Sequence, residues 1–92
     1  MGYQPIWDGA FDVALGDGTS MDDVLGSIFS RKMTLVGYKA DGGAGHPEFT
    51  MRGTRAQFVS WLRGFYMRGL ADRDDHDLWA EYQDAGHFKS VA

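Results

Sequence analysis

Acidic side chains with helical spacing form the clearest chemical pattern in the sequence. They are Asp74, Asp77, Glu81 and Asp84, separated by three, four and three residues. This spacing places them along one face of an α-helix, where like charges repel by roughly 0.2–0.5 kcal/mol per pair. A helix dipole favours acids only in the first turn, so Glu81 and Asp84 stand toward the unfavourable end. Two interpretations stay open: a solvated face that aids solubility, or a surface that binds a basic partner.

Arginines gather just before this acidic pattern, in a stretch that contains no acid. They are Arg52, Arg55, Arg63 and Arg68. Arg55 and Arg63 lie eight residues apart with Val59 between them, which puts both on one flank of a helix. We expect these cations to form ion pairs with the acidic helix. A nucleic-acid groove is disfavoured, because the neighbouring aromatic residues fit a core better than a stacking platform.

The sequence offers no pattern for catalysis or metal binding. The three histidines stand in no metal-binding spacing, and the side chains of residues 74–77 diverge by about 100° per residue on a helix. Segment 12–23 is acidic, but Ala14 and Gly16 occupy positions where a calcium loop needs oxygen ligands. Cysteine and the Gly-x-Ser-x-Gly nucleophile motif are both absent. We therefore expect no enzymatic activity, no cofactor and no metal site.

A glycine-rich turn, Gly42-Gly43-Ala44-Gly45, separates two segments with strand character. It lacks the Gly-Lys-Ser/Thr ending of a phosphate-binding loop, and it leads into a strand instead of a helix. The pattern is typical of the exposed tip of a hairpin. A loop that moulds itself to a partner is the alternative that stays open.

The first half of the chain predicts a strand, a helix and a hairpin. The first 18 residues alternate in part and end in a glycine turn, and Ser20 caps a helix over residues 21–29. Residues 33–40 and 48–52 carry strand patterns on either side of the glycine-rich turn, and Gly53 is expected to break the second strand.

The second half predicts two helices. Thr54 and Gln57 read as a capping box, and the helix they open carries the apolar stripe expected at the centre of the core. The stripe consists of Phe58, Trp61, Leu62, Phe65 and Gly69. The last helix begins at Asp74 or Asp75 and stops at Gly86, and residues 87–92 are expected to fray.

These elements predict an α+β fold with the order β-α-β-β-α-α, in which two or three helices pack on a small antiparallel sheet of two or three strands. The 92 residues are 43% hydrophobic and 14% aromatic, which suits one compact domain, residues 1–92. A net charge of -4 argues against a general nucleic-acid binder. Apolar runs are too short to span a bilayer and no signal-peptide pattern opens the chain, so we expect a cytoplasmic protein.

Some large apolar residues are hard to fit into one small core. They are Tyr66, Met67, Trp79 and Phe88. Surplus aromatic side chains often anchor protein interfaces, so Trp79 joins the acidic residues as a candidate partner contact. Partial burial in the monomer and a homodimer interface are the alternatives.

The segment Glu48 to Leu62, a strand followed by the capped helix Gly53-Thr54-Arg55-Ala56-Gln57-Phe58-Val59-Ser60-Trp61-Leu62, resembles a unit of some small phage-encoded anti-CRISPR proteins. The resemblance implies a non-enzymatic inhibitor in the cytoplasm of a bacterial host. It would bind a host protein or nucleoprotein complex, such as a CRISPR effector, without binding nucleic acid or membrane itself. Asp74, Asp77, Glu81 and Asp84 would then meet the partner's basic surface. The alternative is a self-assembling structural or accessory subunit of a phage or bacterium.

Overall fold

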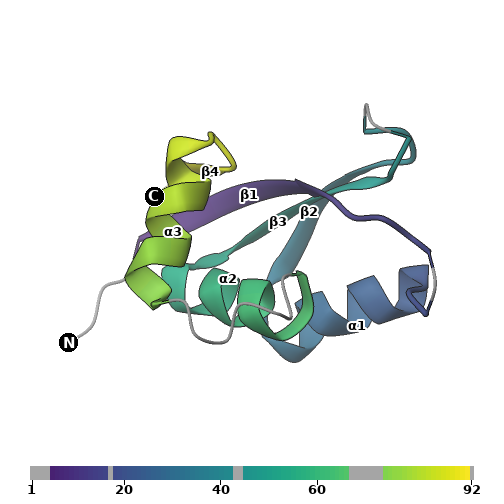
Figure 1. Cartoon of the computed structure of the whole chain (residues 1–92), viewed down its shortest axis with the longest axis horizontal. Helices are drawn as coiled ribbons and strands as arrows, with labels where there is room; N and C mark the ends of the chain where they lie inside the picture. Colours follow the sequence, from purple (N-terminus) through teal and green to yellow (C-terminus); the bar gives the residue numbers. More distant parts are fainter. Residues whose placement is uncertain (1–4, 17, 43–44, 67–73, 92) are drawn as a thin grey trace.

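The computed structural model describes residues 5–16, 18–42, 45–66 and 74–91 (Figure 1). The strands are β1 (Ile6–Asp12), β2 (Thr34–Lys39), β3 (Glu48–Thr54) and β4 (Phe88–Ser90). The helices are α1 (Met21–Ser30), α2 (Arg55–Trp61) and α3 (Asp75–Asp84), with a short π-helix, η1 (Leu62–Tyr66), directly after α2. The α+β class is confirmed, and the order of elements is β-α-β-β-α-α-β.

The strands form one antiparallel sheet with the order β2-β3-β1-β4. The sheet therefore has four strands, where the sequence predicted two or three. The fourth strand lies in the segment expected to fray, and that expectation is wrong. Phe88 is only 5% exposed, and its backbone is paired with Gly9 of β1. An apolar side chain that enters the core, together with a vacant strand edge, holds these last residues in place.

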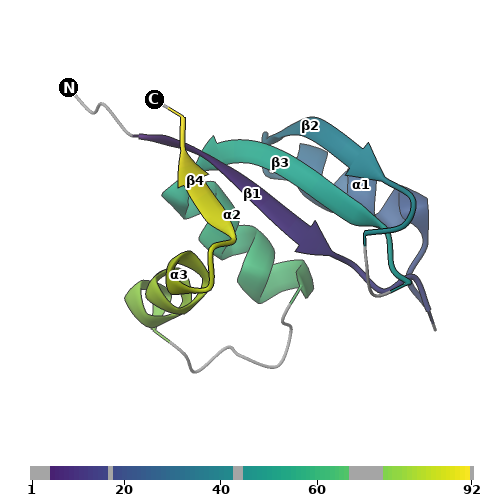
Figure 2. The same ribbon diagram turned by 90° about the horizontal axis from the view of Figure 1, so that it is seen from above.

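The helices cover one face of this sheet. Figures 1 and 2 show α1 and α2 along that face and α3 beside α2, near β4. Phe11, Phe49 and Met51 point to the helices and are fully buried, and they meet Phe58 and Trp61 of the predicted helical stripe. Among the helices of the described residues, none is long and apolar enough to cross a membrane.

The predicted helix starts at Ser20 and Thr54 are confirmed. The hydroxyl of Ser20 accepts a hydrogen bond from the amide of Asp23, and the carboxylate of Asp23 accepts one from the amide of Ser20. Thr54 and Gln57 make the same reciprocal pair at α2, with distances of 3.3 and 2.9 Å. Each capping box satisfies amides that the first turn leaves without partners.

Gly53 does not break the strand, as the sequence had suggested. It lies inside β3, opposite Trp7 of β1. A Cβ atom at this position would lie 2.6 Å from Oε1 of Gln57 and 2.8 Å from Cγ of Met33. The glycine is therefore required by close packing and not by a turn.

The helical stripe changes geometry after Trp61. The α-helix ends there and continues as the π-helix η1, while Gly69 lies outside the described residues. In a π-helix the hydrogen bonds join residues five apart. Tyr66 accordingly stacks on Trp61, with ring centroids 5.0 Å apart, and Phe65 also stacks on it at 5.9 Å. The π-turn brings two consecutive aromatic rings to the same indole.

Candidate functional site

Helix α3 is fixed firmly to the body of the protein. Leu78 is fully buried, and Asp74 caps the first turn by accepting a hydrogen bond from the amide of His76 at 2.7 Å. The helix ends as predicted at Gly86, whose φ of 84° is the left-handed conformation that glycine favours. The amides of Gly86 and His87 donate to the carbonyls of Gln83 and Tyr82, both at 3.0 Å. This Schellman motif turns the chain directly into β4.

The predicted acidic residues all lie on the exposed side of this helix. We call them the acidic face: Asp74, Asp77, Glu81 and Asp84. Within the described part of the chain, Asp77 and Asp84 form no hydrogen bond or ion pair through their side chains. Asp84 is the last residue of α3, and no basic residue lies in that turn. Asp77, Glu81 and Asp84 are exposed residues of α3, while Asp74 is the extended N-cap residue and its carboxylate turns to the amide of His76.

Trp79 does not join the acidic face. It is 5% exposed and stacks on Phe88 with ring centroids 4.2 Å apart and an interplanar angle of 15°. Its indole also meets Trp7 edge-on at 4.9 Å. The prediction of Trp79 as a surface anchor is corrected here, because β4 supplies the aromatic partner that holds the indole in the core. Tyr66 is likewise packed against the core, and Met67 lies outside the described residues.

The arginines do not form one patch. Arg52 points to the sheet face opposite the helices, where Asp8 on the neighbouring strand accepts two hydrogen bonds from it, at 2.8 and 3.1 Å. These hydrogen bonds, together with the charge of Asp8, raise the pKa of the Arg52 guanidinium. Arg68 lies outside the described residues.

Arg55 and Arg63 instead turn toward α3. Nε of Arg63 lies 2.5 Å from Oδ1 of Asp75, and Nη2 of Arg55 lies 3.2 Å from Nδ1 of His76. The expected ion pairing between the arginine stretch and the last helix therefore occurs, but at Asp75, which is outside the acidic face. The cations of α2 and η1 lie on one flank of α3, and the acidic face projects from another.

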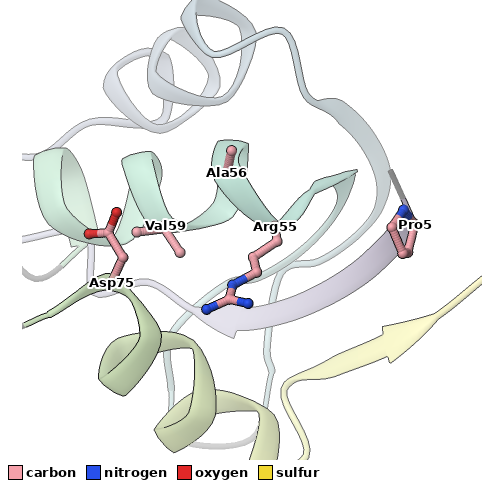
Figure 3. A pocket seen from close by; sticks show the side chains of 5 residues that line it. All are labelled: Pro5, Arg55, Ala56, Val59 and Asp75. Atoms are coloured by element: carbon pink, nitrogen blue, oxygen red, sulfur yellow. The ribbon is translucent and has the colours of Figure 1, made fainter. Parts of the chain in front are cut away.

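A groove runs along the exposed side of α2. One part, of about 410 Å³, is lined by Pro5, Arg55, Ala56, Val59 and Asp75 (Figure 3). A second part, of about 500 Å³, shares Ala56, Val59 and Asp75 with the first and adds Arg31, Ser60, Arg63 and Gly64. We call the two parts together the α2 groove. Arg55, Val59 and Arg63, which the sequence predicted on one flank of the helix, all line the α2 groove.

Arg31 is the residue of this groove that the sequence did not suggest. It caps the C-terminal end of α1, and its Nη1 donates to the carbonyl of Ser27 at 2.9 Å and to the hydroxyl of Ser30 at 3.3 Å. Its Nε is buried without a hydrogen-bond partner in the described structure. Local sequence gives no signal for its place, because only the packing of α1 against η1 brings it to the groove.

A separate cavity of about 410 Å³ lies between the end of β1 and η1, with Asp12, Thr19 and Tyr66 in its lining. The hydroxyl of Tyr66 donates to the backbone carbonyl of Asp12 at 3.3 Å. Burial of the ring, and secondarily the charge of Asp12, raises the pKa of Tyr66 above its ordinary value of 10.0. The phenol therefore stays protonated and acts as a hydrogen-bond donor at neutral pH.

The histidines are spread over three places. His46 is exposed in the β2–β3 hairpin, His76 contacts Arg55, and His87 lies flat against Phe11 with ring centroids 5.1 Å apart. Among the described residues, no group of three or more His, Asp or Glu side chains is arranged to hold a metal ion.

The glycine-rich turn is described only at its two ends. The amide of Gly42 donates to the carbonyl of His46 at 2.8 Å, and this hydrogen bond closes the hairpin. Residues 43 and 44 lie outside the described residues. Contact of this loop with a partner stays a prediction from the sequence.

Comparison with known proteins returned no match to this chain, whether among family models, curated proteins or solved structures.

Proposed function

We propose that this protein is a small, non-enzymatic binding module that docks the acidic face of α3 against a basic surface of a partner protein. The observation that supports the proposal is the separation of charge around α3. Asp77 and Asp84 project into solvent, while Arg55 and Arg63 contact another flank of the same helix. A partner's lysines and arginines would reach the carboxylates of Asp77 and Asp84 without competition from any cation of the described residues.

The position of the acids along the helix also favours binding over mere solvation. An acid at the C-terminal end of a helix opposes the helix dipole, and Asp84 is the last residue of α3. An acid placed in the first turn would aid solubility equally well at no such cost. A contact with a partner's cation would compensate this cost, and this supports the proposal.

The proposed partner is a host protein or nucleoprotein complex with a basic surface. The resemblance to anti-CRISPR proteins points to a CRISPR effector in a bacterial cytoplasm, whose nucleic-acid channel is the kind of surface an acidic helix face fits. In this proposal the carboxylates occupy the place of nucleic-acid phosphates and block access to the channel.

A self-assembling subunit is the second candidate, and exposed apolar residues favour it. Val36 and Tyr38 lie on β2, which is an edge strand of the sheet, and they are 45% and 46% exposed. Phe29 on α1 is 56% exposed. An edge strand with exposed apolar side chains can pair with another copy.

The test is an affinity capture of bacterial host proteins with the tagged chain at low and high salt, together with the native mass of the same preparation. We expect a stoichiometric partner that high salt releases, because screening weakens contacts between exposed charges. Asp77→Lys and Asp84→Lys should each abolish the capture. Asp22→Lys, which reverses an exposed charge in the first turn of α1, is the matched control and should retain the partner.

Capture that survives both α3 variants would refute docking through the acidic face. A discrete mass above that of the monomer, with no partner, would favour the self-assembling subunit. Circular dichroism of each variant establishes that the fold is intact before binding is compared.

A further inference from the structure

The α2 groove gathers guanidinium groups from three separate elements. Arg31 comes from the end of α1, Arg55 from the first turn of α2, and Arg63 from η1. Between them, Ala56 and Val59 form an apolar floor. Asp75 is the one carboxylate in the described lining of either part. The described lining of the groove therefore carries more arginines than carboxylates, in a protein whose net charge is -4.

Arg55 has no carboxylate partner among the described residues. Its contact on α3 is Nδ1 of His76, and a guanidinium only donates hydrogen bonds, so this nitrogen must act as the acceptor of a neutral ring. The guanidinium carbon also lies 5.7 Å from the centroid of the Trp79 ring. Both contacts orient the cation toward the groove without neutralising its charge.

Arg31 is held in a similar way. Its contacts are the carbonyl of Ser27 and the hydroxyl of Ser30, which are neutral acceptors. They engage Nη1, while the buried Nε has no acceptor within the described residues. The guanidinium of Arg31 lines the groove and keeps its full positive charge, because neither acceptor carries a negative charge.

Arg63 completes the set. Asp75 accepts a hydrogen bond from it, and the Asp75 side chain is 68% exposed while that of Arg63 is 26% exposed. An ion pair this exposed stabilises the fold little, so the proposal places no ligand carboxylate on Arg63.

We propose that the α2 groove binds an acidic segment of a partner protein, with carboxylates on Arg31 and Arg55 and a small apolar side chain on Ala56 and Val59. The site goes beyond the proposed function, because it is a different surface with the opposite charge. Arginine suits this task because its planar group can bind a carboxylate through two hydrogen bonds. Parts of about 410 and 500 Å³ hold a few residues of a peptide.

Nucleic acid fits the groove less well than a peptide. Base stacking needs exposed aromatic rings, but Phe58 and Trp61 of α2 are fully buried and Trp79 is 5% exposed. The net charge of -4 repels a polyanion more strongly than a short peptide. A second copy of the protein carries the same net charge, which opposes its approach.

The first experiment titrates the whole protein with a synthetic eight-residue peptide that alternates glutamate and alanine. Nitrogen-15 NMR follows the Nε–H signals of the arginines. We expect saturable shifts at Arg31 and Arg55, with the Arg52 signal unmoved. A peptide with glutamine in place of glutamate should not bind. Absence of binding at millimolar concentrations of the glutamate peptide would overturn the proposal.

Variants then locate the site. Arg55→Gln should weaken peptide binding about tenfold, as expected for the loss of a charged hydrogen bond. Arg52→Gln is the matched control, because it removes the same charge from the opposite face of the sheet. Equal weakening by the two would show non-specific attraction and overturn the proposal.

A second variant guards against failure of Arg55→Gln to fold. Ala56→Glu puts a carboxylate on the floor of the groove at an exposed helical position, where glutamate is well tolerated, and it should abolish peptide binding. Asp77→Lys on the acidic face should leave peptide binding intact. The proposal for the groove and the proposal for the acidic face can therefore be refuted independently.

Parallel titrations test other occupants. Inorganic phosphate and a single-stranded oligonucleotide should bind more weakly than the glutamate peptide. An oligonucleotide that binds more tightly, with Arg55→Gln reducing its affinity, would assign the groove to nucleic acid. Self-association that Arg55→Gln abolishes would assign it to a second copy. Either result would overturn the proposal.

Discussion

The hydrogen bond that joins α1 to α2 inside the core leads to a quantitative prediction. Nε1 of Trp61 donates to the hydroxyl of Ser27 at 3.0 Å, and this hydroxyl in turn donates to the carbonyl of Val24 at 2.6 Å. Trp61 is fully buried and Ser27 is 9% exposed. Ser27→Ala removes the acceptor of the indole N–H and leaves this donor without a partner in an apolar environment.

The expected loss of stability follows from that orphaned donor. A buried polar group without a partner costs about 1–3 kcal/mol in the free energy of unfolding. For a domain of this size each kcal/mol lowers Tm by roughly 4–8 °C. Ser27→Ala should therefore lower Tm by at least about 4 °C. The measurement is urea unfolding followed by far-ultraviolet circular dichroism, supported by thermal melts.

A double-mutant cycle with Trp61→Phe isolates the cause. Phenylalanine has no N–H, so Ser27→Ala in that background removes a hydroxyl without orphaning a donor. The alanine substitution should then cost about 1 kcal/mol less than in the natural chain. Equal costs in the two backgrounds, within about 0.5 kcal/mol, would refute the assignment of this hydrogen bond as the source of stability.

Three further predictions concern a charge, a cap and a titration. Asp84→Lys should stabilise the protein by about 0.3–1 kcal/mol in thermal melts, because a cation suits the end of α3, while Asp22→Lys at the start of α1 should destabilise it. Thr54→Ala should lower the free energy of unfolding in urea by about 0.5–2 kcal/mol, because it removes the cap of α2, and Thr54→Ser should restore most of it. Because the pKa of Tyr66 is raised in the folded state, the unfolded chain loses this proton first. The contribution of Tyr66 to the free energy of unfolding should thus be complete below about pH 10 and fall as the pH rises further. The urea midpoint of the natural chain should then decline with rising pH, and an equally steep decline in a Tyr66→Phe variant would refute the prediction.

The two charged surfaces meet at the start of α3. Asp74 belongs to the acidic face, and the next two residues, Asp75 and His76, contact the arginines of the α2 groove. A partner that engages both surfaces would present a basic region beside an acidic one. Two opposite contacts so close together would fix its orientation as well as its affinity.

The acidic face could be recognised from the sequence because helical periodicity is a local property. Residues three and four apart share a face in any α-helix, so the spacing of Asp77, Glu81 and Asp84 defines a common surface before packing is known. The capping pairs at Ser20 and Thr54 were equally predictable, since each involves residues only three apart.

The burial of Trp79 could not be predicted from its neighbours in the chain. It depends on Phe88, which reaches it only because β4 pairs with β1. Three residues are too few to show a strand pattern, and β4 forms because the free edge of β1 and a core site for Phe88 are both available.

The sequence by itself determined the class of fold, the limits of most helices and strands, and the acidic face, since all depend on short-range spacing and turn chemistry. Only the tertiary structure decided that Arg31, Arg55 and Arg63 meet in one groove and that Asp75 pairs with Arg63. These residues lie on different elements, and their distances are set by how α1, α2, η1 and α3 pack. Packing sums many weak contacts between residues far apart in sequence, and no local pattern records that sum.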